Sequence, residues 1–309
     1  MKYLELGESN LGASRIVLGC MRIADKSLKN TEALLGAALE SGVNMFDHAD
    51  IYGGGESEKR FGEAMKNLRI DRDEIIIQSK CGIHKSPAGI AQFDFSRAHI
   101  LSSVEGSLKR LGTDHLDVLL LHRPDALMDP EEVFSAFEEL SRSGKVLHFG
   151  VSNFSVYQMK LLEKGRYPLI VNQLQFSLLH SGMIDEGFNV NMDKDESVQR
   201  GGDVLNYCRL KDVTVQAWSP LNYGFFEGIF VGNEKFPALN RELERLGEKY
   251  DCSPSAIAFA WILRLPMDIQ AVSGTTDAGR LKELCKGADI RLTREEWYAL
   301  YLAAGKTLP

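Results

Sequence analysis

Residues 44–58 read NMFDHADIYGGGESE, and this stretch combines apolar, ionisable and glycine residues in an unusual order. A short apolar run ends abruptly in Asp47, His48 and Asp50, and Tyr52 and three glycines follow. Ionisable groups in such a place are typical either of a solvated turn or of an active site at the mouth of a barrel. A barrel requires further strands along the chain whose ends also carry reactive side chains.

Eight short runs of β-branched and apolar residues recur along the chain and predict β-strands. They cover residues 16–21, 43–49, 74–81, 116–123, 146–153, 169–177, 213–220 and 268–274. Several of these runs are almost continuously apolar, which is expected of strands buried on both faces of a parallel sheet.

Amphipathic stretches between and after the strands predict helices. They cover residues 31–42, 96–112, 129–145, 153–165, 198–212, 236–250, 253–265 and 275–287. The helix at 129–145 has the clearest beginning, because Asp129 can cap it and Pro130 suits the first helical position. Residues 178–200 lack such a pattern, so we expect a long loop at the barrel rim.

The alternation of strands and helices predicts an α/β protein with a (β/α)8 TIM barrel. A short N-terminal β-hairpin is expected at residues 2–14, and extra helices are expected near the C-terminus. We find no linker rich in Pro, Gly or Ser, so residues 1–309 are predicted to form a single domain.

Composition limits the kinds of partner. The chain has 309 residues, 44% of them hydrophobic, and a net charge of −7 without a basic cluster, so neither nucleic acid nor an anionic membrane is an expected partner. No apolar run is long enough to span a membrane, and the N-terminal residues lack the apolar core of a signal peptide. The five cysteines are scattered without CxxC spacing, which favours reduced thiols and a cytoplasmic location.

Lys80 is the most informative residue at a predicted strand end, because it follows an apolar run and a buried ammonium needs a partner. Asp47 on the neighbouring strand can provide that partner beside Tyr52. A nearby cation is expected to lower the pKa of the phenol, so that Tyr52 can act as a general acid. His122, one strand further, can donate a hydrogen bond to the same oxygen. In isolation, Asp47 and Lys80 would indicate only a structural ion pair.

Asp47, Tyr52, Lys80 and His122 resemble the catalytic tetrad of the aldo-keto reductase superfamily in order, spacing and context. The surrounding motifs are similar too: GVNMFDHADIYGGGESE (42–58), SKCG (79–82), DVLLLHRPD (117–125), GKVLHFGVSNF (144–154), NQLQFS (172–177), AWSPL (217–221) and SGTT (273–276). The resemblance covers essentially the whole chain and is strongest to a bacterial branch of NADP(H)-dependent oxidoreductases.

This resemblance implies that the protein reduces an aldehyde or ketone to an alcohol with NADPH. Nicotinamide C4 would supply the hydride, while Tyr52, tuned by Lys80 and Asp47, would supply the proton and His122 would orient the carbonyl. The resemblance also implies cofactor contacts for Ser152, Asn153 and Gln173 (carboxamide), Trp218 (stacking on the nicotinamide), Ser219 and Leu221 (pyrophosphate), and Ser273, Gly274, Thr275, Arg280 and Glu283 (adenosine end).

The loop after the eighth predicted strand departs from the family pattern. Many members carry a lysine there that pairs with the 2′-phosphate of NADPH, whereas this chain has Asp277. Arg280 is then the remaining charge partner for the phosphate. NADPH is the expected cofactor, and NADH is an alternative. A small-molecule carbonyl is the expected partner, and Met21, Phe93, Phe95, Tyr223, Phe225 and Phe226 predict an apolar pocket for aromatic or extended carbonyls.

Two other functions fit parts of the sequence. A metal-dependent barrel hydrolase could use His48, Asp50, His122 and His180, but the sequence has no HxH motif on the first strand and no tight ligand spacing, so we predict no metal site. A barrel that binds the cofactor as a sensor or regulatory subunit is the other alternative. His48 and Asp50 are expected to shape the loop around the site rather than to react. The oligomeric state is left open.

Overall fold

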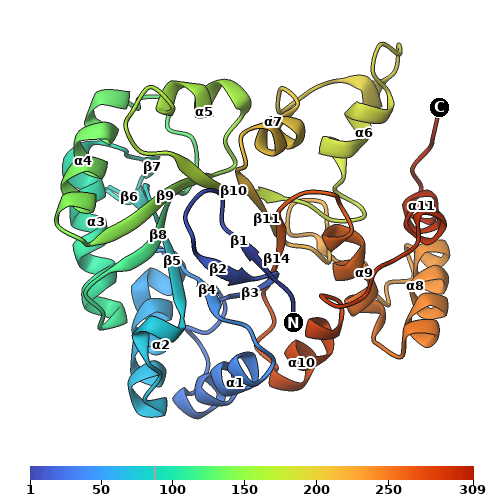
Figure 1. The fold of residues 1–309 in the computed structure, drawn as a ribbon, viewed down its shortest axis with the longest axis horizontal. Coiled ribbons are helices and arrows are strands. Elements are labelled where there is room, and N and C mark those ends of the chain that lie inside the picture. The colour runs from blue at the N-terminus through green and yellow to red at the C-terminus, as the bar shows by residue number, and fades with distance from the viewer. Residues whose placement is uncertain (87) are drawn as a thin grey trace.

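A closed barrel of parallel strands forms the centre of the computed structural model, which describes residues 1–86 and 88–309 (Figure 1). Its strands are β3 (Ile16–Gly19), β4 (Met45–Asp47), β5 (Ile76–Cys81), β8 (Leu116–Leu121), β9 (Val146–Ser152), β10 (Leu169–Gln175), β11 (Thr214–Trp218) and β14 (Ile269–Ser273). Each lies within one of the eight predicted runs, and β14 pairs with β3 to close the ring. The predicted (β/α)8 fold is therefore confirmed.

Helices surround this barrel (Figure 1). They are α1 (Leu28–Glu40), α2 (Glu56–Leu68), α3 (Arg97–Leu111), α4 (Pro130–Arg142), α5 (Val156–Leu162), α7 (Val204–Leu210), α8 (Pro237–Tyr250), α9 (Pro254–Leu263), α10 (Ala278–Lys286) and α11 (Arg294–Ala303). All eight predicted helices are present, although α5 and α7 are shorter than predicted. Sequence patterning did not single out α2, since this helix is highly charged and its buried side contains glycine and alanine beside Phe61 and Met65.

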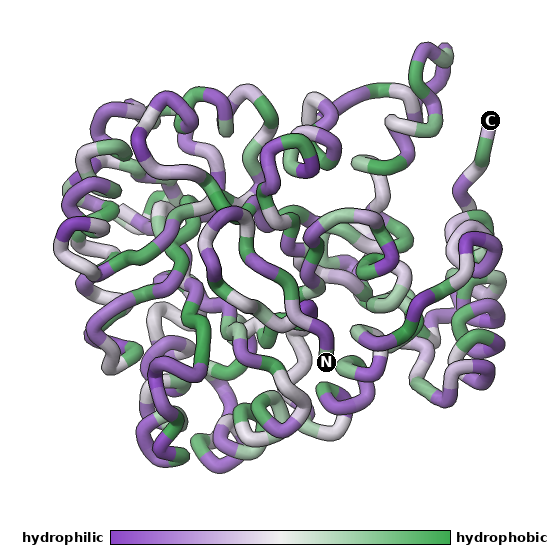
Figure 2. The backbone as a smooth tube through the Cα atoms, in the orientation of Figure 1, coloured by the Kyte–Doolittle hydropathy of each residue, from purple (hydrophilic) through white to green (hydrophobic). Residues whose placement is uncertain are grey.

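The helix caps explain several of these boundaries. Asp129 accepts a hydrogen bond from the backbone N–H of Glu131, and Pro130 occupies the first turn of α4, as predicted. The buried side of α4 consists of Val133, Ala136, Phe137 and Leu140, which repeat at helical spacing. Figure 2 shows the same principle for the whole molecule, with hydrophobic segments along the barrel strands and hydrophilic segments on the outer turns of the helices.

The prediction of a continuous loop at residues 178–200 is wrong, because this segment contains α6 (Gly182–Phe188) and the short 3-10 helix η3 (Asp195–Ser197). Distant residues hold α6 in place. Tyr301 donates its hydroxyl to Asp185 at 2.8 Å, and Lys306 lies 2.7 Å from the same carboxylate. Local periodicity could not reveal this helix, because its partners lie more than 110 residues further along the chain.

The predicted N-terminal hairpin is present as β1 (Tyr3–Glu5) paired with β2 (Gly12–Ser14), and it closes the amino-terminal end of the barrel (Figure 1). Leu6 and Ala13 are fully buried and pack in one cluster with inward-facing strand residues such as Val17 and Met45. The carboxyl end is left for the site, and two further hairpins lie among its loops, β6 (Ile83–Lys85) with β7 (Ala91–Phe93) and β12 (Asn222–Tyr223) with β13 (Gly228–Ile229). Among the described residues, every helix is too short or too polar to span a lipid bilayer.

Candidate active site

A pocket of about 470 Å³ opens at the carboxyl end of the barrel strands. Every site residue expected from the sequence except Lys80 lines it: Asp47, Tyr52, His122, Ser152, Asn153, Gln173, Trp218, Ser219, Leu221, Ser273, Gly274, Thr275, Arg280 and Glu283. The structure therefore brings residues from all parts of the sequence into one cavity. Lys80 does not line the cavity itself, but its ammonium contacts Asp47 and Tyr52, which do.

The Asp47–Lys80 ion pair lies at the floor of this pocket. Lys80 Nζ is 2.7 and 2.8 Å from the two carboxylate oxygens of Asp47, and the two side chains are 0% and 4% exposed. The same ammonium donates to the backbone oxygen of His48 at 2.7 Å and to the hydroxyl of Tyr52 at 3.1 Å. Burial acts to lower the pKa of Lys80, but Asp47 and Tyr52 outweigh it and raise that pKa, so the lysine stays charged.

Tyr52 is brought over the barrel by the glycines that follow it. Gly53, Gly54 and Gly55 all have positive φ, and a Cβ on Gly53 would lie 2.5 Å from that of Ala24. The three glycines thus provide a tight backbone path that other residues would not follow. The expected lowering of the phenol pKa is wrong for this state: burial raises the pKa of Tyr52 above its ordinary value, and Lys80 opposes that shift without reversing it.

The rings of His122 and Tyr52 are nearly perpendicular, at 82°, and their centroids are 5.8 Å apart. Burial, together with the positive charges of Lys80 and Arg123, lowers the pKa of His122 well below its ordinary value. The imidazole is therefore neutral at neutral pH and can donate one N–H. Arg123 lines the pocket next to it and lies with its guanidinium carbon 5.5 Å from the ring centroid of Trp218.

A layer of glutamine amides inside the barrel supports Asp47. Gln78 and Gln173 each donate an amide N–H to Asp47 Oδ1, at 2.6 and 3.0 Å. Gln216 connects these two amides to Gln270, which donates in turn to the backbone oxygen of Ser14. Sequence reasoning did not predict this layer, although a glutamine within each of four apolar strand runs was a signal for it.

A second group of largely buried ionisable side chains consists of Glu58, Asp50 and His48. Glu58 is fully buried and accepts hydrogen bonds from Ser79 Oγ at 2.6 Å and from Arg110 Nε at 2.7 Å. Burial, with the nearby Glu58 carboxylate, raises the pKa of Asp50 to about 7. Burial and Lys80 lower the pKa of His48 to about 3. The His48 and Phe61 rings pack in a T-shaped arrangement with their centroids 4.5 Å apart. Neither Asp50 nor His48 lines the pocket.

The residues expected at the nicotinamide form one hydrogen-bonded unit. Trp218 Nε1 donates to Asn153 Oδ1 at 3.0 Å, and Asn153 Nδ2 donates to Ser152 Oγ at 2.8 Å. Asn153 and Ser219 both have positive φ, which is uncommon outside glycine and often occurs at functional sites. The amide N–H groups of Gln173 are used by Asp47 and Gln216, so its Oε1 is the atom left for a ligand.

The far end of the pocket, by contrast, is exposed. Asp277 caps α10 by accepting from the backbone N–H of Arg280 at 2.7 Å. The Arg280 guanidinium lies 3.9 Å from the same carboxylate, and its side chain is 78% exposed. Thr275 Oγ1 accepts from the backbone N–H of Asp277, and Glu283 pairs with Lys286 at 2.9 Å.

Only part of the predicted apolar pocket is found. Met21 and Phe226 line the cavity, and Phe226 stacks on Trp218 with ring centroids 5.9 Å apart. Phe93, Phe95, Tyr223 and Phe225 do not line it. Phe95 is buried in the core, whereas Phe93 and Phe225 are exposed. The direction of a side chain in these loops depends on how the loop packs in three dimensions, which the sequence pattern does not reveal.

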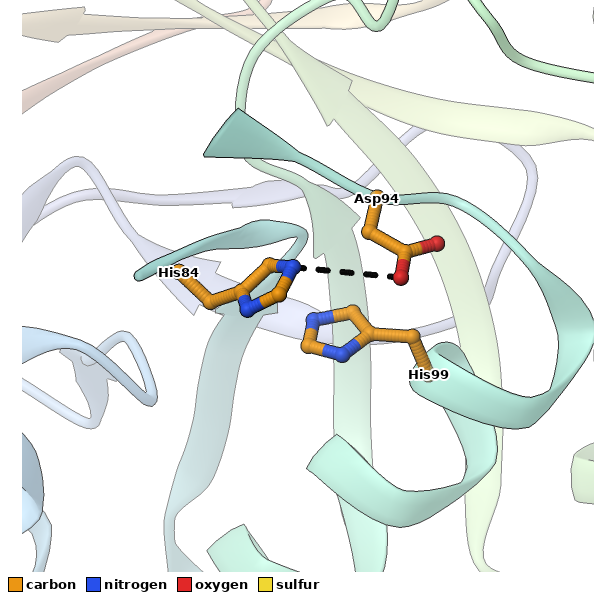
Figure 3. Close-up of side chains that lie close together, drawn as sticks. All are labelled: His84, Asp94 and His99. Atoms are coloured by element: carbon orange, nitrogen blue, oxygen red, sulfur yellow. Dashed lines mark ion pairs between the residues drawn. The ribbon is translucent and has the colours of Figure 1, made fainter. Parts of the chain in front are cut away.

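The four residues considered for a hydrolytic metal site, His48, Asp50, His122 and His180, do not form a group of ligands. Within residues 1–86 and 88–309, the one group of three potential ligands is His84, Asp94 and His99, which lies outside the pocket (Figure 3).

Several known proteins are similar to this chain in sequence and in fold. A model of the Aldo/keto reductase family matches residues 15–301. A "6-dehydroglucose reductase" of Agrobacterium fabrum is 37% identical over 307 residues, with 96% of each chain covered. "Oxidoreductase YdhF" of Escherichia coli is 36% identical, covering 94% of this chain and 93% of its own. The thermostable aldo-keto reductase Tm1743, solved with the inhibitor epalrestat, superimposes with a TM-score of 0.77 at 28% identity, covering 98% of this chain and 100% of its own. The chain therefore belongs to the aldo/keto reductase family of NAD(P)H-dependent oxidoreductases.

Proposed function

We propose that this protein reduces an aldehyde or ketone to an alcohol with NADPH, using Tyr52 as the proton donor. The observation that carries the proposal is the position of Lys80 Nζ, which lies within 3.1 Å of both the Asp47 carboxylate and the Tyr52 hydroxyl at the floor of the pocket. When bound, the nicotinamide would supply the hydride that reduces the carbonyl carbon.

The protein's own residues would handle the proton. The raised pKa of Tyr52 keeps the phenol protonated before the reaction, so the proton is available to the carbonyl oxygen. Once the proton has left, the Lys80 ammonium can stabilise the phenolate, and the Asp47 carboxylate keeps that ammonium charged. The neutral His122 would donate a hydrogen bond to the same carbonyl oxygen and hold it near Tyr52.

The lining of the pocket suits a nicotinamide dinucleotide. Gln173 Oε1 is free to accept an N–H from the carboxamide, with Ser152 and Asn153 beside it. Trp218 offers a ring to the nicotinamide, while Ser219 and Leu221 line the path toward the far end, where Ser273, Gly274, Thr275, Arg280 and Glu283 would hold the adenosine. Arg280 favours NADPH by its charge, and Asp277 weakens that preference, so NADH is the second cofactor to test.

The substrate end combines polar and apolar groups. Arg22 and Arg123 line the pocket as hydrogen-bond donors, whereas Phe226 and Trp218 present rings. Hydroxylated aldehydes are therefore candidates beside aromatic ones, and the name of the Agrobacterium fabrum relative points to the same class. We further propose that residues 1–309 act as one domain and that the protein works in the cytoplasm.

NADPH oxidation in the presence of a carbonyl panel tests this function. The panel contains hydroxylated, aromatic and aliphatic aldehydes and ketones, each assayed with the purified protein and with a Tyr52→Phe variant. We expect NADPH oxidation with at least one class and stoichiometric alcohol product, both lost in the variant. If the protein binds NADPH but oxidises it with no carbonyl, the sensor or regulatory interpretation replaces this one.

A further inference from the structure

A second cluster of ionisable side chains lies outside the pocket, where the hairpin β6–β7 meets the first turn of α3 (Figure 3). His84, Asp94 and His99 each offer one ligand atom there, and these atoms all lie within 4.8 Å of one another. We propose that His84, Asp94 and His99 bind a divalent first-row transition-metal ion, with Zn²⁺ as the best match to the donor set.

The hairpin brings the first two ligands together. His84 on β6 lies directly opposite Gln92 on β7. Asp94 follows Gln92 by two residues, and its backbone N–H donates to Gly82, which continues the ladder by one step. Because side chains two residues apart in a strand share a face, His84 and Asp94 project from the same side of the hairpin. His84 Nε2 lies 3.8 Å from Asp94 Oδ2.

The start of α3 provides the third ligand. Asp94 Oδ1 accepts the backbone N–H of Ser96 at 2.8 Å, which fixes the carboxylate and leaves Oδ2 toward the histidines. Ser96 is the N-cap of α3 and accepts from the backbone N–H of His99 at 3.3 Å. The His99 ring stacks on that of His84 with centroids 4.5 Å apart (Figure 3). Three short backbone segments thus place the three ligand-bearing residues next to one another.

The electrostatics of this cluster favour a bound cation. Asp94 carries the negative charge, and no lysine or arginine among the described residues forms an ion pair with it. The remaining contacts to the rings are weak or replaceable. Gln92 Nε2 lies 2.9 Å from His84 Nε2, and Ser103 Oγ lies 3.3 Å from His99 Nε2. Gln92 is exposed, so its amide can exchange this contact for water at little cost.

Two imidazole nitrogens and one carboxylate oxygen select the kind of ion. Ca²⁺ and Mg²⁺ prefer sites made of oxygen ligands, whereas Zn²⁺, Co²⁺ and Ni²⁺ readily take imidazole. Three protein ligands leave a fourth position for water. A tetrahedral ion with bonds of about 2.0–2.2 Å needs its ligand atoms roughly 3.4 Å apart. The most widely separated ligand atoms must therefore approach by up to about 1.4 Å. Rotation of the partly exposed His84 and His99 side chains allows this while Asp94 keeps its hydrogen bond to the Ser96 N–H.

Isothermal titration of the chelator-treated full-length protein with Zn²⁺ tests the site, and Co²⁺ provides a second readout through its visible absorption. We expect one ion per chain. Asp94→Asn keeps an oxygen for the Ser96 N–H but removes the charged ligand, so it should weaken Zn²⁺ binding by about tenfold or more, as should His99→Ala. His115→Ala is the matched control, because His115 also lies beside aspartates but belongs to no group of three potential ligands in the described part of the chain.

Circular dichroism of each variant in EDTA shows whether it folds, and carbonyl reduction in EDTA shows that the active site is separate. Binding with unchanged affinity in both Asp94→Asn and His99→Ala, or no binding to the parent protein, would overturn the proposal. An equal loss of binding in His115→Ala would also do so, since it would mean scattered surface histidines hold the ion.

Discussion

Two ion pairs, Lys80–Asp47 and Arg280–Asp277, lie at opposite ends of the same pocket. They differ in burial, in the distance between the charges and in the number of neighbouring hydrogen-bond donors. Lys80 and Asp47 are buried, 2.7 Å apart, and connected to further donors on both sides. Arg280 and Asp277 are 3.9 Å apart, with side chains 78% and 52% exposed. Coulomb attraction is strong in the first environment and weakened by water and salt in the second.

The difference suggests separate roles for the two ends of the pocket, with catalysis at the buried end and cofactor preference at the exposed end. The buried pair fixes the charge next to Tyr52 before any ligand arrives, so the catalytic end is preorganised. The exposed pair can rearrange around whatever phosphate is present, and we therefore expect it to set only a modest preference between NADPH and NADH. Changes at the catalytic end should have large effects on turnover or stability, whereas changes at the far end should have small effects on binding.

The largest expected effect belongs to Tyr52→Phe. This variant loses the proton donor but keeps the ring, so turnover with any carbonyl substrate should fall by about 10²- to 10⁴-fold. NADPH affinity should stay within about twofold, because in the proposed mechanism the hydroxyl takes part in the chemical step and not in cofactor binding. Steady-state NADPH oxidation and fluorescence titration measure the two quantities. Parallel loss of binding and turnover would contradict the assigned role.

Lys80→Met tests the buried pair itself. The substitution leaves the Asp47 carboxylate buried with only the amides of Gln78 and Gln173 as donors. Removing one member of a buried pair typically costs about 3–5 kcal/mol of unfolding free energy, and the two amides should keep the loss near the lower limit. Urea unfolding measures it. The Asp47→Asn/Lys80→Met double variant is the control and should recover part of the loss, whereas an unchanged stability of Lys80→Met would mean that the pair is not electrostatically coupled.

Asp50 gives a pH-dependent prediction at the same end of the pocket. Its folded-state pKa is raised from 3.8 to about 7, mainly by burial, so the folded protein keeps a proton that the unfolded chain releases near pH 4. The stability contributed by this proton is therefore complete below about pH 4, falls as the pH rises to about 7, and changes no further above that.

Asp50→Asn, which resembles the protonated carboxyl, should remove this dependence. The unfolding free energy of the variant relative to the parent should rise between pH 5 and pH 8 by on the order of 2 kcal/mol. Urea unfolding at the two pH values measures the difference, and Glu234→Gln on the surface serves as control. A constant difference at both pH values would show that Asp50 is ionised in the folded protein throughout.

The smallest effects are expected for the exposed pair. Arg280→Ala should weaken NADPH by up to about tenfold and leave NADH nearly unchanged, since only NADPH carries the 2′-phosphate. Asp277→Asn keeps the helix cap and removes a charge that repels this phosphate, so it should strengthen NADPH by a few-fold. Fluorescence titrations with both cofactors measure these ratios. Equal changes for NADPH and NADH would place the phosphate elsewhere.

The same contrast separates what the sequence could and could not predict. Lys80 was predictable because an ammonium after an apolar strand requires a buried anion, and parallel strands place Asp47 beside it. The pKa shift of Tyr52 was not predictable. Its direction depends on how deeply the ring is buried, which only the three-dimensional packing determines. The α6 helix and the cluster of His84, Asp94 and His99 depend on contacts between separate elements, so a local sequence pattern could not predict them.

Tryptophan fluorescence during titration with NADPH tests whether the nicotinamide binds beside Tyr52. The chain has three tryptophans, of which Trp261 and Trp297 stack on each other in the core and Trp218 lines the pocket. If the nicotinamide lies beside Tyr52, NADPH should quench the fluorescence saturably, NADH should bind somewhat more weakly, and most of the quenching should be lost in Trp218→Phe. Absence of quenching by both cofactors, or equal quenching in Trp218→Phe, would contradict the placement of the nicotinamide beside Tyr52.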